Sequence, residues 1–265
     1  MSYPSFAVNH YLCPPDVPLD TFADVVASAG FDGIGLTQAA LDEMPVPALK
    51  ALLDSRGLQV SSLNTAGFFL SEDPEQARRN ERLLQVAAEL QAPALNVIVG
   101  ATGPDVPLEQ ARARAEAGLA GLAERAQQLG VQLVVEPLWL ANAFTKSCFH
   151  SISQLRGVFS RIPGLKLNLD YYHLWCDPDL GDVLRAADIP VGLLQVCDVS
   201  WADTPNQALR APLGEGRLSV LAQLAAAGHA GEGHTVELEL FIDQLPGRDY
   251  ADLIRDAARQ LLPQG

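Results

Sequence analysis

The sequence lacks the features that mark secreted and membrane-spanning proteins. Its four cysteines are widely scattered and include no CxxC pair, so neither a disulfide framework nor a cysteine metal site is expected. It has no unbroken run of about 18 apolar residues, the length that crosses a bilayer. The opening residues, "MSYPSFAVNHYLCPP", have no basic region leading into an apolar stretch, as a signal peptide would. We therefore expect a cytoplasmic protein.

Positive charge is also scarce. The chain has 18 lysines and arginines against 32 aspartates and glutamates, which gives a formal net charge of −14. Residues 111–130 come nearest to a basic patch, but their arginines are interleaved with glutamates at helical spacing, which is typical of a solvated helix face. Because an acidic chain repels phosphates, we expect no nucleic-acid partner and no membrane partner.

Apolar residues, by contrast, are abundant and follow a regular order. Of the 265 residues, 48% are hydrophobic, which is enough for one large core. Short apolar runs alternate with longer segments of helical period, the pattern of repeated βα units. Eight runs predict strands, at residues 6–9, 32–36, 58–63, 94–99, 131–136, 165–170, 191–196 and 234–240. Helices are expected at about residues 19–29, 45–55, 74–91, 108–129, 151–160, 178–187, 217–227 and 249–262.

This order of elements predicts an α/β fold, a (β/α)8 TIM barrel formed by residues 1–265 as a single domain. The alternative is an open doubly wound sheet. Such sheets that bind nucleotides carry a glycine-rich phosphate turn, and neither GxGxxG nor GxxxxGKS/T follows any of the runs. The barrel is therefore the favoured architecture.

Polar side chains stand at the ends of four consecutive predicted strands. In "LKLNLD" the leucines share one face, so Asp170 lies on the other and points into the barrel at its mouth. The same alternation in "HTVELEL" turns Glu239 inward at the mouth and Glu237 inward at a deeper level. A single acid in such a place can simply cap the next helix. Four strand ends in a row favour a shared site, formed by Glu136, Asp170, Gln195 and Glu239.

Three converging carboxylates repel one another unless a cation neutralises them. Three carboxylates and one amide would form an all-oxygen ligand set, which suits Mg²⁺ or Mn²⁺ better than Zn²⁺. We therefore expect one divalent metal ion, manganese or magnesium.

Several motifs resemble the xylose isomerase-like barrels, a family of sugar-phosphate isomerases and epimerases, ketose 3-epimerases and related dehydratases. The resemblance covers residues 130–245 well and the N-terminal half in pattern only. The motifs that carry it are "VVEPL", "LDYYHLWCDP", "LLQVCD", "RAPLGEG" and "VELELF".

The resemblance implies a divalent-metal-dependent isomerase or epimerase of a sugar or sugar phosphate. Such an enzyme removes a proton next to a carbonyl and passes through an enediolate. The metal ligands would be Glu136, Asp170, Gln195 and Glu239, and the two glutamates would also be the catalytic acid and base. His173 and Arg210 match the positions that contact substrate oxygens. Members of the family are often dimers or tetramers.

Two departures from the family pattern leave other functions open. Gln195 stands where sugar epimerases usually carry histidine, and a glutamine there is similar to the 3-dehydroshikimate dehydratase branch, so a metal-dependent dehydratase of a cyclic polyol ketone is one alternative. Gly35 replaces a glutamate of many relatives, and a barrel that binds a polyol without catalysis is another. The apurinic endonucleases of the same barrel need more histidines than the five present.

Other residues near the predicted mouth are weaker candidates for substrate contact. They follow the first, third, fifth and sixth predicted strands, and the aromatic one would line the mouth beside a sugar ring. These candidates are His10, Asn64, Lys146 and Trp175.

Overall fold

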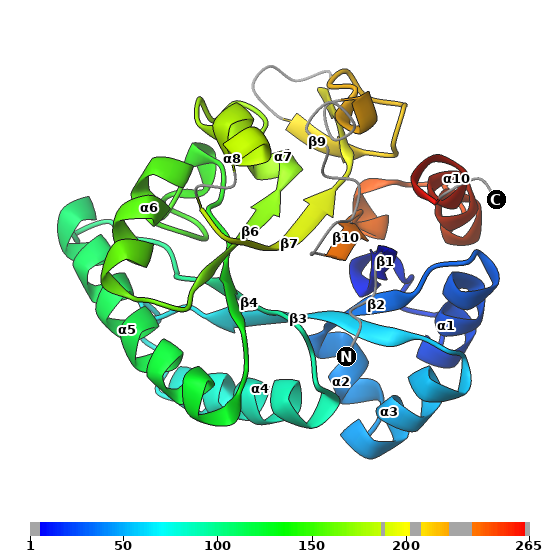
Figure 1. The fold of residues 1–265 in the computed structure, drawn as a ribbon, viewed down its shortest axis with the longest axis horizontal. Helices are drawn as coiled ribbons and strands as arrows, with labels where there is room; N and C mark the ends of the chain where they lie inside the picture. The colour runs from blue at the N-terminus through cyan, green and yellow to red at the C-terminus, as the bar shows by residue number, and fades with distance from the viewer. Residues whose placement is uncertain (1–5, 187–188, 202–207, 223–234, 263–265) are drawn as a thin grey trace. The chain divides into compact units, whose positions relative to one another are not determined.

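The structure is a computed structural model that describes residues 6–186, 189–201, 208–222 and 235–262 (Figure 1). The predicted helix at 217–227 therefore lies partly outside the described residues, as does His234, the expected first residue of the last strand.

Eight parallel strands form a closed barrel in the order β1-β10-β7-β6-β5-β4-β3-β2, which confirms the predicted fold class. The prediction succeeded because strands buried on both faces appear as short apolar runs separated by helical segments. The barrel strands are β1 (Phe6–Asn9), β2 (Gly33–Thr37), β3 (Gln59–Gly67), β4 (Leu95–Ile98), β5 (Leu133–Val135), β6 (Lys166–Asp170), β7 (Val191–Val196) and β10 (Thr235–Leu238).

Helices connect the strands and begin or end where local chemistry dictates. Ser151 accepts a hydrogen bond from the N–H of Gln154 at the start of one helix, and Gly130, at φ 69°, ends another in the left-handed conformation that glycine adopts freely. The helices are α1 (Leu19–Ser28), α2 (Gln38–Glu43), α3 (Val46–Ser55), α4 (Gln76–Leu90), α5 (Leu108–Leu129), α6 (Ile152–Arg161), α7 (Tyr171–Leu174), α8 (Leu180–Ala186) and α10 (Tyr250–Leu261), with 3₁₀ turns η1 (His10–Leu12), η2 (Leu140–Asn142) and η3 (Ile242–Gln244). Among the described helices, none is both long and apolar enough to span a membrane.

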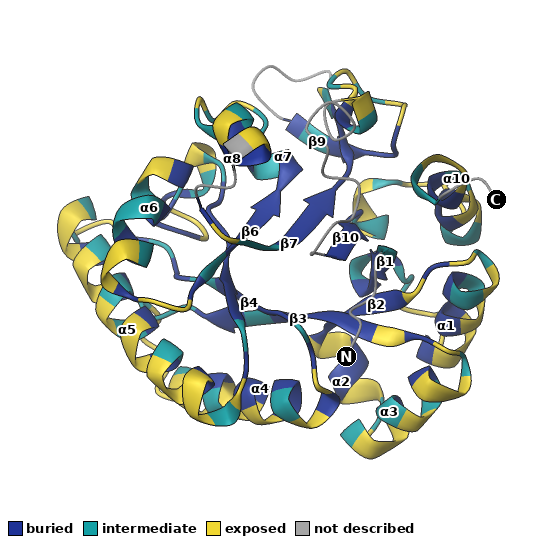
Figure 2. Ribbon diagram, in the orientation of Figure 1, coloured by how far each residue is buried: buried dark blue, intermediate teal, exposed yellow. Residues whose placement is uncertain are grey.

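Most residues of the barrel strands are buried, and the outer faces of the helices are exposed (Figure 2). By contacts, the chain divides into two compact units. Residues Met1–Ser61 and Leu194–Gly265 form the first, called here the terminal unit, and residues Ser62–Leu193 form the second, called the middle unit. Apolar side chains such as Val134 and Leu193 pack in the middle unit, and Phe22 stacks on Tyr250 in the terminal unit.

The sequence did not predict the helices α2 and α7, and two strand regions near the site also differ from the prediction. The strand expected at residues 58–63 continues to Gly67 and so contains Asn64. Asparagine, alanine and glycine are depleted in strands, and these three residue types in the extension hid it. An antiparallel hairpin of β8 (Asp198–Trp201) and β9 (Ala208–Ala211) follows β7, and it carries Arg210. Both strands of the hairpin are four residues long, too short for a clear alternation.

Candidate active site

Two carboxylates of the middle unit lie at the ends of neighbouring strands. Asp170 is the last residue of β6 and Glu136 directly follows β5, where its N–H donates to the carbonyl of Val97 at 3.1 Å. Their residues are 0% and 4% exposed. The register that pairs β5 with β6 therefore brings two buried acids to the carboxyl end of the barrel strands.

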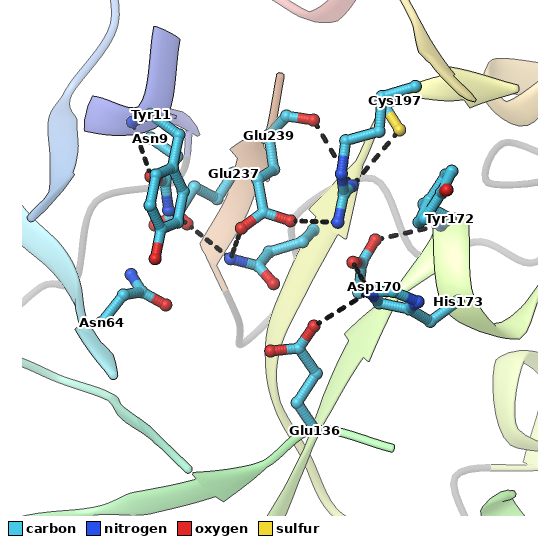
Figure 3. Close-up of polar contacts among 12 residues, drawn as sticks. Asn9, Tyr11, Asn64, Glu136, Asp170, Tyr172, His173, Cys197, Glu237 and Glu239 are labelled. Carbon is cyan, nitrogen blue, oxygen red and sulfur yellow. Dashed lines mark hydrogen bonds and ion pairs between the residues drawn. The ribbon is translucent and has the colours of Figure 1, made fainter. Parts of the chain in front are cut away.

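His173 lies on α7, one turn beyond Asp170, and faces both acids (Figure 3). Its Nε2 is 3.7 Å from Oε1 of Glu136 and 3.5 Å from Oδ2 of Asp170. One potential ligand atom from each of the three residues lies within 4.8 Å of the others. This group, called here the Glu136 cluster, has the size and composition of a metal-binding site.

The hydrogen bonds of His173 indicate what its ring can do. The backbone N–H of Trp139 donates to Nδ1 at 3.2 Å, so Nδ1 carries a lone pair and the proton of the neutral ring lies on Nε2. The nitrogen that faces the carboxylates is therefore a hydrogen-bond donor. In this arrangement Glu136 and Asp170 offer lone pairs to a cation, whereas His173 offers an N–H group.

The remaining oxygens of the two acids are held by the surrounding chain. Oδ1 of Asp170 accepts the N–H of Tyr172 at 2.9 Å and caps α7. Asp170 therefore caps a helix with one oxygen, as considered from the sequence, while its other oxygen faces His173. Oε2 of Glu136 accepts from Nδ2 of Asn96 at 2.5 Å. Both carboxylates are thus fixed through one oxygen, and the other faces His173.

Asn96, which was not singled out from the sequence, belongs to a hydrogen-bonded chain that includes the candidate Asn64. Its Nδ2 also donates to Oδ1 of Asn64 at 3.1 Å, and Asn64 donates to Oγ of Ser62 at 2.9 Å. Asn96 is 2% exposed. The alternation of Leu95, Asn96 and Val97 on β4 was a usable signal, because it turns one polar side chain away from its apolar neighbours.

The terminal unit holds a second polar cluster, which surrounds Glu237 on β10. Glu237 is 0% exposed and accepts from Nδ2 of Asn9 at 2.7 Å, Nε2 of Gln195 at 2.9 Å and Oγ of Ser61 at 2.6 Å. Three neutral donors thus surround one carboxylate. The alternation in "HTVELEL" predicted that Glu237 points inward, but Glu237 was not among the predicted site residues.

Glu239 shares Gln195 with Glu237 and forms an ion pair with Arg210 (Figure 3). Nε2 of Gln195 donates to its Oε1 at 3.1 Å, and Nη2 of Arg210 lies 2.7 Å from its Oε2. Both partners of the pair have side chains that are 4% exposed. The guanidinium also lies over Phe241, which stacks on Tyr11, and neither aromatic residue was singled out from the sequence.

The weaker sequence candidates lie in different surroundings. His10 is 8% exposed and bonds through Nδ1 to Oγ1 of Thr37 at 2.9 Å. Burial lowers its pKa from 6.5, against the raising effect of Glu43. Trp175 is half-buried and Lys146 is exposed. Asn64 lies inside the amide chain described above.

Comparisons with known proteins agree with this architecture. No curated protein matches the chain. A protein of Sinorhizobium meliloti 1021 is 23% identical with a TM-score of 0.81, covering 97% of this chain and 96% of that one. The IOLI protein, solved with a zinc atom, is 16% identical with a TM-score of 0.80 and coverage of 96% and 95%. D-psicose 3-epimerase of Clostridium cellulolyticum H10, solved with D-tagatose, is 16% identical with a TM-score of 0.72 and coverage of 97% and 96%.

Identities this low show a shared fold and leave the chemistry open. The model of one protein family, however, matches residues 23–263, which is nearly the whole barrel. The chain belongs to the xylose isomerase-like TIM barrel family.

Proposed function

We propose that this chain is a divalent-metal-dependent isomerase or epimerase of a sugar or polyol ketone. It would remove the proton next to the carbonyl and pass through an enediolate. The Glu136 cluster carries the proposal, because two buried carboxylates and a histidine N–H group meet there in a barrel of a family that includes such enzymes. A similar fold in D-psicose 3-epimerase supports the reaction class.

The donor set fits a hard divalent cation. Glu136 and Asp170 would hold it, and we propose Gln195 and Glu239 as the further ligands, so that every donor is oxygen. Mn²⁺ and Mg²⁺ prefer oxygen, and His173 presents N–H rather than a lone pair. Bound there, such an ion acts as a Lewis acid that polarises the substrate carbonyl.

The side chains themselves would move and hold the protons. A carboxylate oxygen of Glu136 or Glu239 takes the α proton, and the other glutamate returns a proton to the enediolate. Nε2–H of His173 donates to a substrate oxygen. Asn96 and Arg210 keep the two glutamates in place through the contacts described above, and burial of both acids limits exchange of their protons with water.

A dehydratase is the second candidate, and Gln195 favours it. Its Nε2 donates to both Glu237 and Glu239, so the amide is built into the site where sugar epimerases usually carry histidine. If the substrate bears a hydroxyl β to its carbonyl, the same abstraction of the α proton, with a proton returned to that hydroxyl by the other glutamate, expels it as water. A barrel that only binds a polyol would do neither.

Exchange of the α proton with solvent tests these readings together. D-tagatose, D-fructose and an inosose would each be incubated in D₂O with EDTA-stripped protein, with and without Mn²⁺, and followed by ¹H NMR. Metal-dependent exchange that is lost in Glu136→Gln and kept in the surface variant Glu116→Gln supports the proposal. A new alkene signal identifies the dehydratase. Absence of both signals for every substrate would indicate a binding protein.

The proposal extends to the form of the protein. We propose that residues 1–265 act as one domain, because the closed strand order draws strands from both units. All four cysteines are free, which fits the reducing cytoplasm. A homodimer or homotetramer is expected from the family, and neither nucleic acid nor a membrane is expected as a partner.

A further inference from the structure

The buried charges of this protein are strongly unbalanced. All 18 lysines and arginines fall within the described residues, and Arg210 is the one that is buried. The described residues include five buried carboxyl groups, those of Glu136, Asp170, Asp198, Glu237 and Glu239. Each unit thus carries more buried acid than buried base.

Arg210 is already committed to neighbours within the terminal unit. Its Nη2 lies 2.7 Å from Oε2 of Glu239, and its Nη1 lies 3.4 Å from Sγ of Cys197 and 3.5 Å from the carbonyl of Glu239. The ring of Phe241 covers one face, with the guanidinium carbon 5.1 Å from the ring centroid. Even with a divalent ion at the proposed site, five buried carboxyl groups would outnumber the buried positive charge. Moving Arg210 to an anionic substrate would therefore add buried negative charge without adding a cation, which is costly.

Within residues 6–186, 189–201, 208–222 and 235–262, the other groups near the strand ends that could bind phosphate are paired, capped or exposed. Arg217 and Lys146 are exposed, and Arg248 pairs with Glu215 at 2.7 Å. The start of α7 is capped by Asp170, so an anion there would meet a carboxylate. Phosphate sites normally use arginine, lysine or open backbone N–H groups.

We infer that the substrate is an uncharged polyol ketone, and that phosphate esters and carboxylic acids are excluded. This inference rests on the proposed function. It selects the free sugars over sugar phosphates, and it selects an inosose-type ketone over 3-dehydroshikimate, which is a carboxylate. The guanidinium of Arg210 stays paired with Glu239, so it would contact only uncharged oxygens of the substrate.

A titration with an anion tests whether Arg210 stays paired with Glu239, and it needs no catalytic assay. Thermal unfolding of EDTA-treated protein would be followed with inorganic phosphate, against sodium chloride at matched ionic strength. Wild type should show no saturable rise in Tm. Glu239→Gln releases Arg210 and should bind phosphate at least tenfold more tightly than wild type, whereas the double variant Glu239→Gln/Arg210→Gln should lose that gain.

Glu237→Gln is the matched control, because it removes the same charge from the same strand but leaves the pair of Arg210 with Glu239 intact. Glu237→Gln should show no phosphate-dependent rise in Tm. A saturable rise in wild type, or a folded Glu239→Gln that shows none, would overturn the inference. If circular dichroism shows that Glu239→Gln does not fold, the wild-type titration decides.

A second experiment separates this inference from the proposed function. Solvent exchange of the α proton would be compared for D-tagatose and D-tagatose 6-phosphate with Mn²⁺-loaded wild type. The free sugar should exchange at least 100-fold faster. A preference for the ester would overturn the inference and leave the proposed function standing. No exchange with either substrate would count against the proposed function, and the phosphate titration would still decide the commitment of Arg210.

Discussion

Trp139 donates its backbone N–H to Nδ1 of His173 at 3.2 Å, so the segment after β5 determines which nitrogen of a histidine on α7 faces Glu136 and Asp170. The ring is oriented by main chain, which no substitution at position 139 except proline removes. The side chain of His173 should therefore act as a fixed Nε2–H donor.

Glutamine and asparagine distinguish the two ring nitrogens. A glutamine amide can reach the place of Nε2, whereas an asparagine amide ends near Nδ1. We expect His173→Gln to retain much of kcat/KM and His173→Asn to lose about 100-fold, the usual effect of removing one aligned donor. ¹⁵N NMR of the wild-type imidazole should show the Nε2–H form. Equal losses in both variants, or an Nδ1–H signal, would contradict the assignment.

Asn96 should affect catalysis through the position of Glu136. Asn96→Ala removes the donor at 2.5 Å from Oε2, and we expect activity to fall by about 10- to 100-fold, as for other groups that orient a ligand carboxylate. Asn96→Asp places a second acid against Glu136 and should lose more. The measurement is kcat with saturating metal.

Asn80 provides the matched control for Asn96. It is buried, and its side chain bonds to the N–H and the carbonyl of Gly67 and to Gln76 rather than to Glu136. Asn80→Ala should therefore lower the free energy of unfolding by about 1–3 kcal/mol and leave kcat of the folded protein unchanged. A loss of kcat in Asn80→Ala as large as in Asn96→Ala would show that the effect is one of general stability.

Metal binding should stabilise the folded protein. Mn²⁺ at about 100 times its Kd should add about 2.7 kcal/mol to the free energy of unfolding. Asp170→Asn and Glu136→Gln should each remove most of the resulting rise in Tm, because they remove proposed ligands. Glu116→Gln, which alters an exposed ion pair with Arg161, should keep it. An unchanged rise in both ligand variants would place the ion elsewhere.

The sequence predicted those parts of the site that depend on one strand at a time. Alternation along "LKLNLD" is enough to place Asp170 inside the barrel mouth, and "VVEP" does the same for Glu136. The contact between Asn96 and Glu136 depends on the register between β4 and β5, which pairs Asn96 with Val134, and a single run of residues does not determine a register. The sequence shows that Asn96 is a polar residue on β4, but it does not show that Glu136 is its partner.

Arg210 shows a second limit of prediction from sequence. The motif "RAPLGEG" pointed to Arg210 as a substrate contact, but its pairing with Glu239 requires the β8–β9 hairpin, where Arg210 stands opposite Val199. The hydrophobic pattern of residues 198–211 does not predict that hairpin. The family resemblance thus identified Arg210 as a candidate, whereas its ion pair with Glu239 was found only in the three-dimensional structure.

His10 predicts a specific pH dependence of stability. Burial lowers its pKa in the folded protein below the ordinary value of 6.5, so the unfolded chain binds the proton first as the pH falls. The free energy of unfolding should therefore be highest above 6.5 and decrease as the pH drops below that value. His10→Asn keeps a hydrogen-bonding amide near the position of Nδ1 for Thr37 but cannot titrate, and it should show a smaller decrease. Part of the slope should remain in the variant, because burial and the Arg112 cation also lower the pKa of His150. Urea unfolding of both proteins from about pH 5 to about pH 8 measures the difference, and identical slopes would show that His10 titrates alike in the folded and unfolded chains.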